Sequence, residues 1–193
     1  WNTVQNVRNA PSCDKSTLPT ADFAAYGERL TQVAEYCASE GVPLSFHHHM
    51  GTGVETEREL DLVMQNTGDT VGLLVDTGHL VFAGGDLMGV VDRYGHRINH
   101  VHTKDIRQEV MATVDRTKDS FLDCVLRGVF TVPGDGMIDY GRFMQALADK
   151  NYEGWVIVEA EQDPAKANPF EYAVMGYNAL QQAALAAGYS IID

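Results

Sequence analysis

The sequence predicts an α/β fold built on a parallel β-sheet, and three observations lead to that class. Segments with the period of an amphipathic helix alternate along the chain with short apolar segments of strand length. Strand-like segments begin near residues 44, 71 and 98, a step of 27 residues, which is close to the size of a βα unit, about 30 residues. The segment 71–75 is continuously apolar, as in a sheet covered on both faces. Two architectures fit, an open doubly wound sheet or part of a (β/α)₈ barrel.

The predicted helices are segments in which apolar side chains recur every three or four residues on one face. Local signals mark several of their ends. Gly41 is placed to end the first helix, Thr56 opens a capping box with Glu59, and Asn168 precedes a proline at the first position of the last helix. The expected helices are 22–39, 56–66, 86–94, 139–147 and 168–188.

The predicted strands lie between these helices, at 42–46, 71–75, 98–103 and 154–158. The last strand begins 56 residues after the third, twice the usual step, so we expect an insertion between about residues 105 and 135. A chain of 193 residues is predicted to form a single domain over 1–193.

Composition and charge narrow the classes of function. Acidic residues outnumber basic ones by 27 to 14, giving a net charge of −13, which disfavours a protein that binds nucleic acid by neutralising phosphates. No apolar run reaches the roughly 18 residues of a membrane span, so no membrane partner is expected. The three cysteines, Cys13, Cys37 and Cys124, are widely spaced and form no C-x-x-C motif. We therefore expect a reducing, cytoplasmic setting.

Ionisable side chains stand at the carboxyl end of every predicted strand. In parallel α/β folds, active sites form at that edge of the sheet. Because side chains alternate between the two faces of a strand, residues two positions apart share a face, so His48 points away from its neighbours. The strand-end residues are His47 and His49, Asp76 and His79, His100, His102 and Lys104, and Glu159 and Glu161.

These residues are interpreted jointly, because each alone has an ordinary explanation. A single histidine at a strand end is commonly a hydrogen-bonded core or surface residue, and a lone Asp-Thr-Gly-His is compatible with a turn. Consecutive strands that all end in ligand-type residues are not explained by turns, since clustered buried charges must be paired or bound to metal. Nitrogen and oxygen donors without thiolates favour Mn²⁺, Co²⁺, Fe²⁺ or Mg²⁺, with Zn²⁺ as a further candidate.

Several motifs resemble those of a known family. The strings HHHMGT at 47–52 and DTGHLVFAGGD at 76–86, with HVHTKD at 100–105, are similar to those of the inosose dehydratases. Further similarity lies in SFLD at 120–123 and GVFTVPGDG at 128–136. The resemblance runs from about residue 20 to 185. The wider superfamily is that of the xylose isomerase-like TIM barrels, which contains sugar isomerases, epimerases, dehydratases and a DNA-repair endonuclease.

The resemblance implies a divalent metal held at the ends of barrel strands five to eight, usually by Glu, Asp, His and Glu. Mapped onto this sequence, Asp76, His102 and Glu159 take the last three places. The first place falls on His47, a departure from the usual glutamate, and His49 is an alternative that would otherwise contact substrate.

The resemblance also implies substrate contacts and a reaction. His79, three residues after the aspartate, is expected to touch substrate, as is Lys104 or Arg107 beyond the third ligand. The family removes water from 2-keto-myo-inositol, giving a trihydroxycyclohexane dione, with Mn²⁺ or Co²⁺ as expected metals and glutathione as an expected reductant. General acid–base candidates are Glu161, His79 and Lys104, with roles unassigned.

Other functions remain open from the sequence. A metal-dependent isomerase or epimerase of the same superfamily could use the same ligands, and a non-catalytic barrel relative is disfavoured by intact Asp76, His102 and Glu159. A repair endonuclease is disfavoured because the acidic chain would repel DNA. For a dehydratase, an isomerase or an epimerase, the expected partner is a small cyclic polyol or sugar.

The last expectation concerns the extent of the barrel. A (β/α)₈ barrel takes about 250 residues and eight strands. The predicted strands match the fifth to eighth of the family, so 1–193 is predicted to be the C-terminal portion of a barrel that lacks its first strands. The alternatives are an open sheet complete as it stands, or two half barrels that pair as a homo-oligomer.

Overall fold

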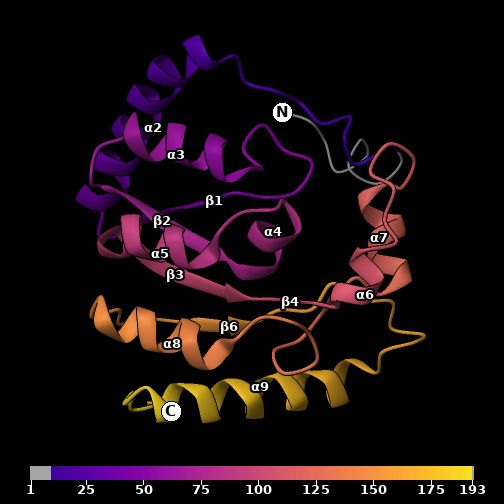
Figure 1. The fold of residues 1–193 in the computed structure, drawn as a ribbon. Helices are drawn as coiled ribbons and strands as arrows, with labels where there is room; N and C mark the ends of the chain where they lie inside the picture. The colour runs from indigo at the N-terminus through magenta and orange to yellow at the C-terminus, as the bar shows by residue number, and fades with distance from the viewer. Residues whose placement is uncertain (1–9, 193) are drawn as a thin grey trace.

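The computed structural model of the protein, which describes residues 10–192, contains a parallel sheet of four strands (Figure 1). The strands are β1 (Leu44–His47), β2 (Val71–Asp76), β3 (Ile98–Thr103) and β6 (Val156–Val158). They lie in the order β1-β2-β3-β6, and every neighbouring pair is parallel. Because all of them run the same way, their carboxyl ends meet at one edge of the sheet. The predicted α/β class with a parallel sheet is confirmed.

The helices predicted from periodicity are all present. Thr56 and Glu59 form the expected capping box, and the side chain of Asn168 caps a helix that begins at Pro169. Within residues 10–192, no helix has the length and apolar character that crossing a membrane would need. The helices are α2 (Phe23–Ser39), which follows a short 3₁₀ turn η1 (Thr20–Asp22), α3 (Glu57–Gln65), α5 (Leu87–Tyr94), α8 (Tyr140–Asp149) and α9 (Pro169–Ala186).

The remaining elements lie outside the predicted segments. Helix α4 (Thr77–Phe82) follows β2 without a break and is too short to show a period. The expected insertion holds α6 (Gln108–Met111) and α7 (Phe121–Arg127), flanked by β4 (Asp105–Ile106) and β5 (Phe130–Thr131), which pair antiparallel. Its apolar side chains, together with Met50 and Phe82, form a second cluster apart from the main core. The cluster contains Met50, Phe82, Ile106, Phe121, Cys124, Val129 and Phe130.

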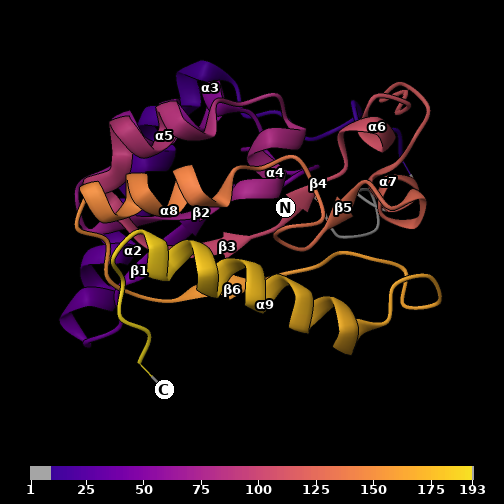
Figure 2. The ribbon, with the colours of Figure 1, turned by 60° about the horizontal axis from the view of Figure 1, so that its bottom comes forward.

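The main core lies between the sheet and helices α3, α5 and α8, with α9 packed beside α8 (Figure 2). Strand β2 is buried along its whole length, whereas β1 and β6 are half-buried. This difference follows from the topology, because β1 and β6 form the two edges of the sheet and do not pair with each other in the described residues. The sheet is therefore open between these edges.

Arg97 joins the main core to the turn before β2. It lies in the 3₁₀ turn η2 (Gly95–Arg97), is buried, and donates to carbonyl oxygens of Val71, Met64 and Gly68 at 2.7 to 2.9 Å. Its Nη2 also donates to the hydroxyl of Thr67 at 2.8 Å. One planar guanidinium thus satisfies carbonyl groups at the end of α3, in the turn after it and at the start of β2.

We predict that Arg97→Ala lowers the free energy of unfolding by about 2–4 kcal/mol, because it leaves several buried carbonyls without donors. Arg97→Lys should recover little of this loss, since an ammonium lacks the planar fork that reaches all these acceptors. Urea unfolding monitored by circular dichroism measures the change. Arg58→Ala, at an exposed position of α3, is the control and should change stability by less than about 0.5 kcal/mol. Wild-type stability in Arg97→Lys would contradict the argument.

Candidate metal and catalytic site

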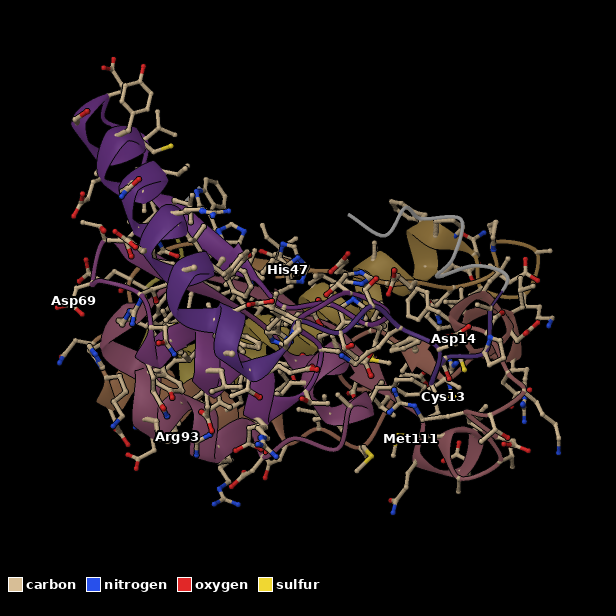
Figure 3. All side chains as sticks on the ribbon, turned by 90° about the horizontal axis from the view of Figure 1, so that it is seen from above. Cys13, Asp14, His47, Asp69, Arg93 and Met111 are labelled. Carbon is tan, nitrogen blue, oxygen red and sulfur yellow. The ribbon has the colours of Figure 1, made fainter. Side chains whose placement is uncertain are left out.

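The ionisable side chains at the ends of the four strands converge at one edge of the sheet. In Figure 3, which views the molecule from above, His47 lies near the middle of the molecule, away from Cys13 and Asp14. Nε2 of His47 is 3.7 Å from Oδ2 of Asp76, and Nδ1 of His102 is 3.8 Å from the same oxygen. Nδ1 of His102 is also 3.0 Å from Oε2 of Glu159. Asp76, His102 and Glu159 thus form one candidate ligand group, and His47 joins it through Asp76, which it shares with His79 in a second group.

The donor atoms of this group are buried and lack hydrogen-bond partners: Nε2 of His47, Oδ2 of Asp76, Nδ1 of His102 and Oε2 of Glu159. The contact between His102 and Glu159 is short, but its direction does not make a hydrogen bond. Buried polar atoms are normally paired, so four unpaired atoms facing one another need a common partner. Two ligands at about 2.1 Å from one ion are about 3.0–3.6 Å apart for angles of 90–120°. The donor set thus fits a divalent cation.

Asp76 has a second role that explains its orientation. Its Oδ1 accepts a hydrogen bond from the backbone N–H of His79 at 2.9 Å and so caps α4. This leaves Oδ2 free to face the other donors. Burial by itself raises the pKa of Asp76, yet His79, His47 and Lys104 hold that pKa well below its ordinary value. The carboxylate is therefore ionised at neutral pH.

A second group lies beside the first and contains the predicted acid–base residues. Nζ of Lys104 is 2.6 Å from Oε2 of Glu161 and 2.8 Å from Nε2 of His79. It is also 3.5 Å from both Oδ2 of Asp76 and Oε2 of Glu159, so it links the two groups. Burial lowers the pKa of Lys104, but the surrounding carboxylates outweigh burial and raise it. Since an ammonium can only donate, Nε2 of His79 accepts, and the imidazole proton lies on Nδ1.

His49 belongs to the second group. Its ring lies against that of His79, with centroids 3.8 Å apart, and the two residues form a cluster with Glu161. Nδ1 of His49 lies 2.8 Å from the carbonyl oxygen of Met50, and a carbonyl can only accept, so Nδ1 carries the proton. His47 instead faces Asp76. This geometry favours His47 as the first ligand and leaves Nε2 of His49 available to a substrate.

Two other residues singled out from the sequence lie apart from these groups. The guanidinium of Arg107 donates to the carbonyl of Gly128 at 2.8 Å and to Asp135 at 2.6 Å, and it lies over the ring of Tyr172 in α9. It therefore joins the insertion to α9 and does not reach the strand-end cluster through these contacts. His100 lies next to His102 on the same face of β3, with ring centroids 5.3 Å apart, but in no candidate ligand group.

Sequence reasoning missed an aromatic wall contributed by the insertion. The ring of Phe121 lies 5.7 Å from that of His49 and 5.8 Å from that of His79, and Phe130 lies 5.9 Å from His79. Both phenylalanines are buried, so they keep water from one side of the imidazoles. Their motifs contribute to the family resemblance, but no periodicity indicates which rings they contact.

Gly78 makes room for the buried lysine. A Cβ at this position would lie 2.7 Å from Cγ of Lys104, 2.8 Å from its Cβ and 2.9 Å from its carbonyl oxygen. Real Cβ atoms do not approach other atoms this closely, so the aliphatic stem of Lys104 can lie here only against a glycine. Glycine in the Asp-Thr-Gly-His motif is thus required by packing.

We predict that Gly78→Ala destabilises the protein by about 1–3 kcal/mol, because the added methyl group overpacks against Lys104 and its backbone. Thermal unfolding measures the loss. Gly53→Ala is the matched control, since a Cβ there meets no atom within 4 Å. Equal melting temperatures for the two variants would show that Lys104 is not packed against Gly78.

Comparison with known proteins assigns the family. The profile described as "Xylose isomerase-like TIM barrel" matches residues 4–182. An inosose dehydratase of Clostridium tetani is 50% identical over 183 residues, covering 94% of this chain and 61% of that protein. The rhizopine catabolism protein MocC of Rhizobium meliloti is 48% identical over 181 residues, covering 94% of this chain and 56% of that protein. The chain thus spans about three fifths of the length of such relatives.

Solved structures agree in fold. The IolI protein, described with a bound zinc atom, superposes with a TM-score of 0.56 at 21% identity, covering 90% of this chain and 57% of that one. A D-psicose 3-epimerase superposes with a TM-score of 0.62 at 19% identity, covering 90% of this chain and 60% of that one. Together with the family profile, the sheet and the strand-end site, these similarities show that the chain belongs to the xylose isomerase-like TIM barrel family.

Proposed function

We propose that this chain carries the metal site and the acid–base groups of a hydro-lyase that removes water from 2-keto-myo-inositol or a closely related cyclic polyol ketone. The observation that carries the proposal is that four buried donor atoms, from His47, Asp76, His102 and Glu159, lie around one edge of the sheet without hydrogen-bond partners. Curated inosose dehydratases that are 42–50% identical to the chain support the same reaction.

The proposed ligands suit a hard or borderline divalent cation, and Mn²⁺ or Co²⁺ is the first candidate, ahead of Mg²⁺, Fe²⁺ and Zn²⁺. When bound, such a cation would polarise the keto oxygen as a Lewis acid and make the neighbouring C–H more acidic. Three of the four proposed ligands, His47, Asp76 and His102, lie in strands β1, β2 and β3, and Glu159 directly follows β6, so the strands fix their geometry before the metal binds.

The reaction also needs a group that takes the α-proton and a group that gives a proton to the leaving hydroxyl. Nζ of Lys104 holds protons, whereas Nε2 of His79 and Oε2 of Glu161 are acceptors, and the three atoms lie within 3.5 Å of one another. Proton donor and proton acceptor are thus adjacent on one side of the proposed metal. General acid–base help of this kind contributes about 10²–10⁴-fold to a rate.

The proposal also concerns the rest of the barrel, beyond the four strands of the parallel sheet. We place β1, β2, β3 and β6 as the fifth to eighth strands of a (β/α)₈ barrel in which residues 1–193 form part of one domain. Support comes from the open, half-buried edges at β1 and β6 and from the greater length of the relatives. Further strands at those edges would enclose the inner face, where His100 and His102 lie.

We expect Asp76→Asn to reduce metal affinity by at least about 100-fold, because a neutral amide replaces an anionic ligand. The amide oxygen still caps α4, so any loss reports on the ligand and not on the cap. His79→Ala is the contrasting variant and should keep wild-type metal content while losing much of kcat/KM. Mass spectrometry measures the metal content of both variants, isothermal titration measures their metal affinity, and steady-state kinetics measures kcat/KM. Full metal content in Asp76→Asn would rule out this carboxylate as a ligand.

The reaction itself is tested on the full-length protein. Chelation should abolish the formation of the ultraviolet-absorbing dione from 2-keto-myo-inositol, and Mn²⁺ or Co²⁺ should restore it. D-Fructose is the control substrate for the isomerase or epimerase alternative. Interconversion of ketohexoses without dehydration would replace the proposed reaction with that alternative, and full activity without metal would refute the metal-dependent mechanism.

A further inference from the structure

A chain of two hydroxyl groups connects helix α8 with the backbone of Lys104. The hydroxyl of Tyr140, in the first turn of α8, lies 2.8 Å from Oγ1 of Thr77. Oγ1 of Thr77 in turn lies 2.8 Å from the carbonyl oxygen of Lys104 and 3.0 Å from its backbone nitrogen. Thr77 is fully buried and Tyr140 is 6% exposed, so water does not compete for these bonds.

The donor and the acceptor in each hydrogen bond follow from the protons and lone pairs that each group has. The carbonyl oxygen of Lys104 can only accept, so the single proton of the Thr77 hydroxyl points to it. The backbone N–H of Lys104 donates to one lone pair of the same oxygen. Only one lone pair of Oγ1 then remains, so Tyr140 is the donor in the third bond. The hydroxyl of Thr77 is thereby saturated, and its rotation is fixed by three partners.

These hydrogen bonds take the place of sheet hydrogen bonds at Lys104, just after the end of β3. Lys104 lies between β3 and β4, outside both strands, so no ladder hydrogen bonds hold its backbone. One side chain, Thr77, satisfies both backbone polar groups of Lys104. The aliphatic stem of the same lysine packs against Gly78. The backbone and the stem of Lys104 are thus fixed by two adjacent residues of the turn after β2.

We propose that Tyr140 is a positioning residue that, through Thr77, fixes the backbone from which Lys104 extends its ammonium to Glu161 and His79. The proposal rests on the proposed function only in assigning a catalytic use to Lys104. Because that ammonium makes contacts of 2.6 Å and 2.8 Å, a small rotation of the backbone at residue 104 would break both. Displacements of about 1 Å can reduce a rate by about 100-fold.

The test is Tyr140→Phe in the full-length protein loaded with its divalent metal, together with Thr77→Ser and Thr77→Val. We expect Tyr140→Phe to lower kcat by about 10- to 100-fold, with KM changed by less than about threefold and metal content unchanged. Thr77→Ser keeps the hydroxyl and should stay within about threefold of wild type, whereas Thr77→Val should lose at least as much as Tyr140→Phe.

Tyr152→Phe is the matched control, because it also removes a buried tyrosine hydroxyl, one that donates to the carbonyl of Trp155 at 2.7 Å. It should lower the melting temperature without changing kcat. Equal kcat values for Tyr140→Phe and Tyr152→Phe would overturn the proposal, because the hydroxyl of Tyr140 would then be only structural.

A second readout separates this proposal from the proposed reaction. The ¹⁵N resonance of the Lys104 ammonium, assigned by its absence in Lys104→Met, should shift or broaden in Tyr140→Phe and stay unchanged in Tyr152→Phe. An unchanged signal in Tyr140→Phe would overturn the positioning role. If the wild-type protein does not dehydrate the inosose, the proposed function fails, and this spectrum alone decides whether Tyr140 positions the lysine.

Discussion

Asp76 is fully buried at the end of β2, and an ionised carboxylate in a protein interior is stable only when hydrogen bonds and opposite charges surround it. One of its oxygens accepts from the backbone of His79, and the other faces His47, His102 and Lys104. The same residue therefore caps α4, lies close to the imidazoles of His47 and His102 and attracts the buried lysine. Helix α4, the imidazoles and the buried lysine at this edge of the sheet thus share one carboxylate.

Charge balance gives an independent argument for a divalent ion. The carboxylates of Asp76, Glu159 and Glu161 surround one ammonium, that of Lys104, so the three negative charges and one positive charge leave a net charge of −2. His79 does not supply the missing charge, because burial lowers its pKa well below the ordinary value, whereas Glu159 raises the pKa of His102, which offsets part of the negative charge when it is protonated. A cluster of this charge in a partly buried site is stabilised by a doubly charged cation close to Oδ2 of Asp76.

The convergence of the strand-end residues could be predicted because it depends only on regular geometry. Parallel strands bring their carboxyl ends together, and the two-residue period places His47 and His102 on the inner face. The contacts made by Arg107 and Phe121 could not be predicted in this way. Arg107 bonds to Asp135, 28 residues away, and Phe121 packs on His49, 72 residues away, and both contacts depend on how the irregular insertion folds back. No periodic pattern in the sequence indicates how an irregular insertion folds back onto distant residues.

Each of the four residues of Asp-Thr-Gly-His makes its own contact at this edge of the sheet. Asp76 faces the proposed metal, Thr77 holds the backbone of Lys104, Gly78 accepts its stem, and His79 contacts its ammonium. Each residue makes a different contact, so a substitution at any of them disturbs a separate interaction. Because three of the four partners are parts of Lys104, the turn fixes this lysine relative to Asp76 within a few ångströms. The proposed metal site and the proposed acid–base groups are therefore joined by a single short segment, so that both can reach the same substrate.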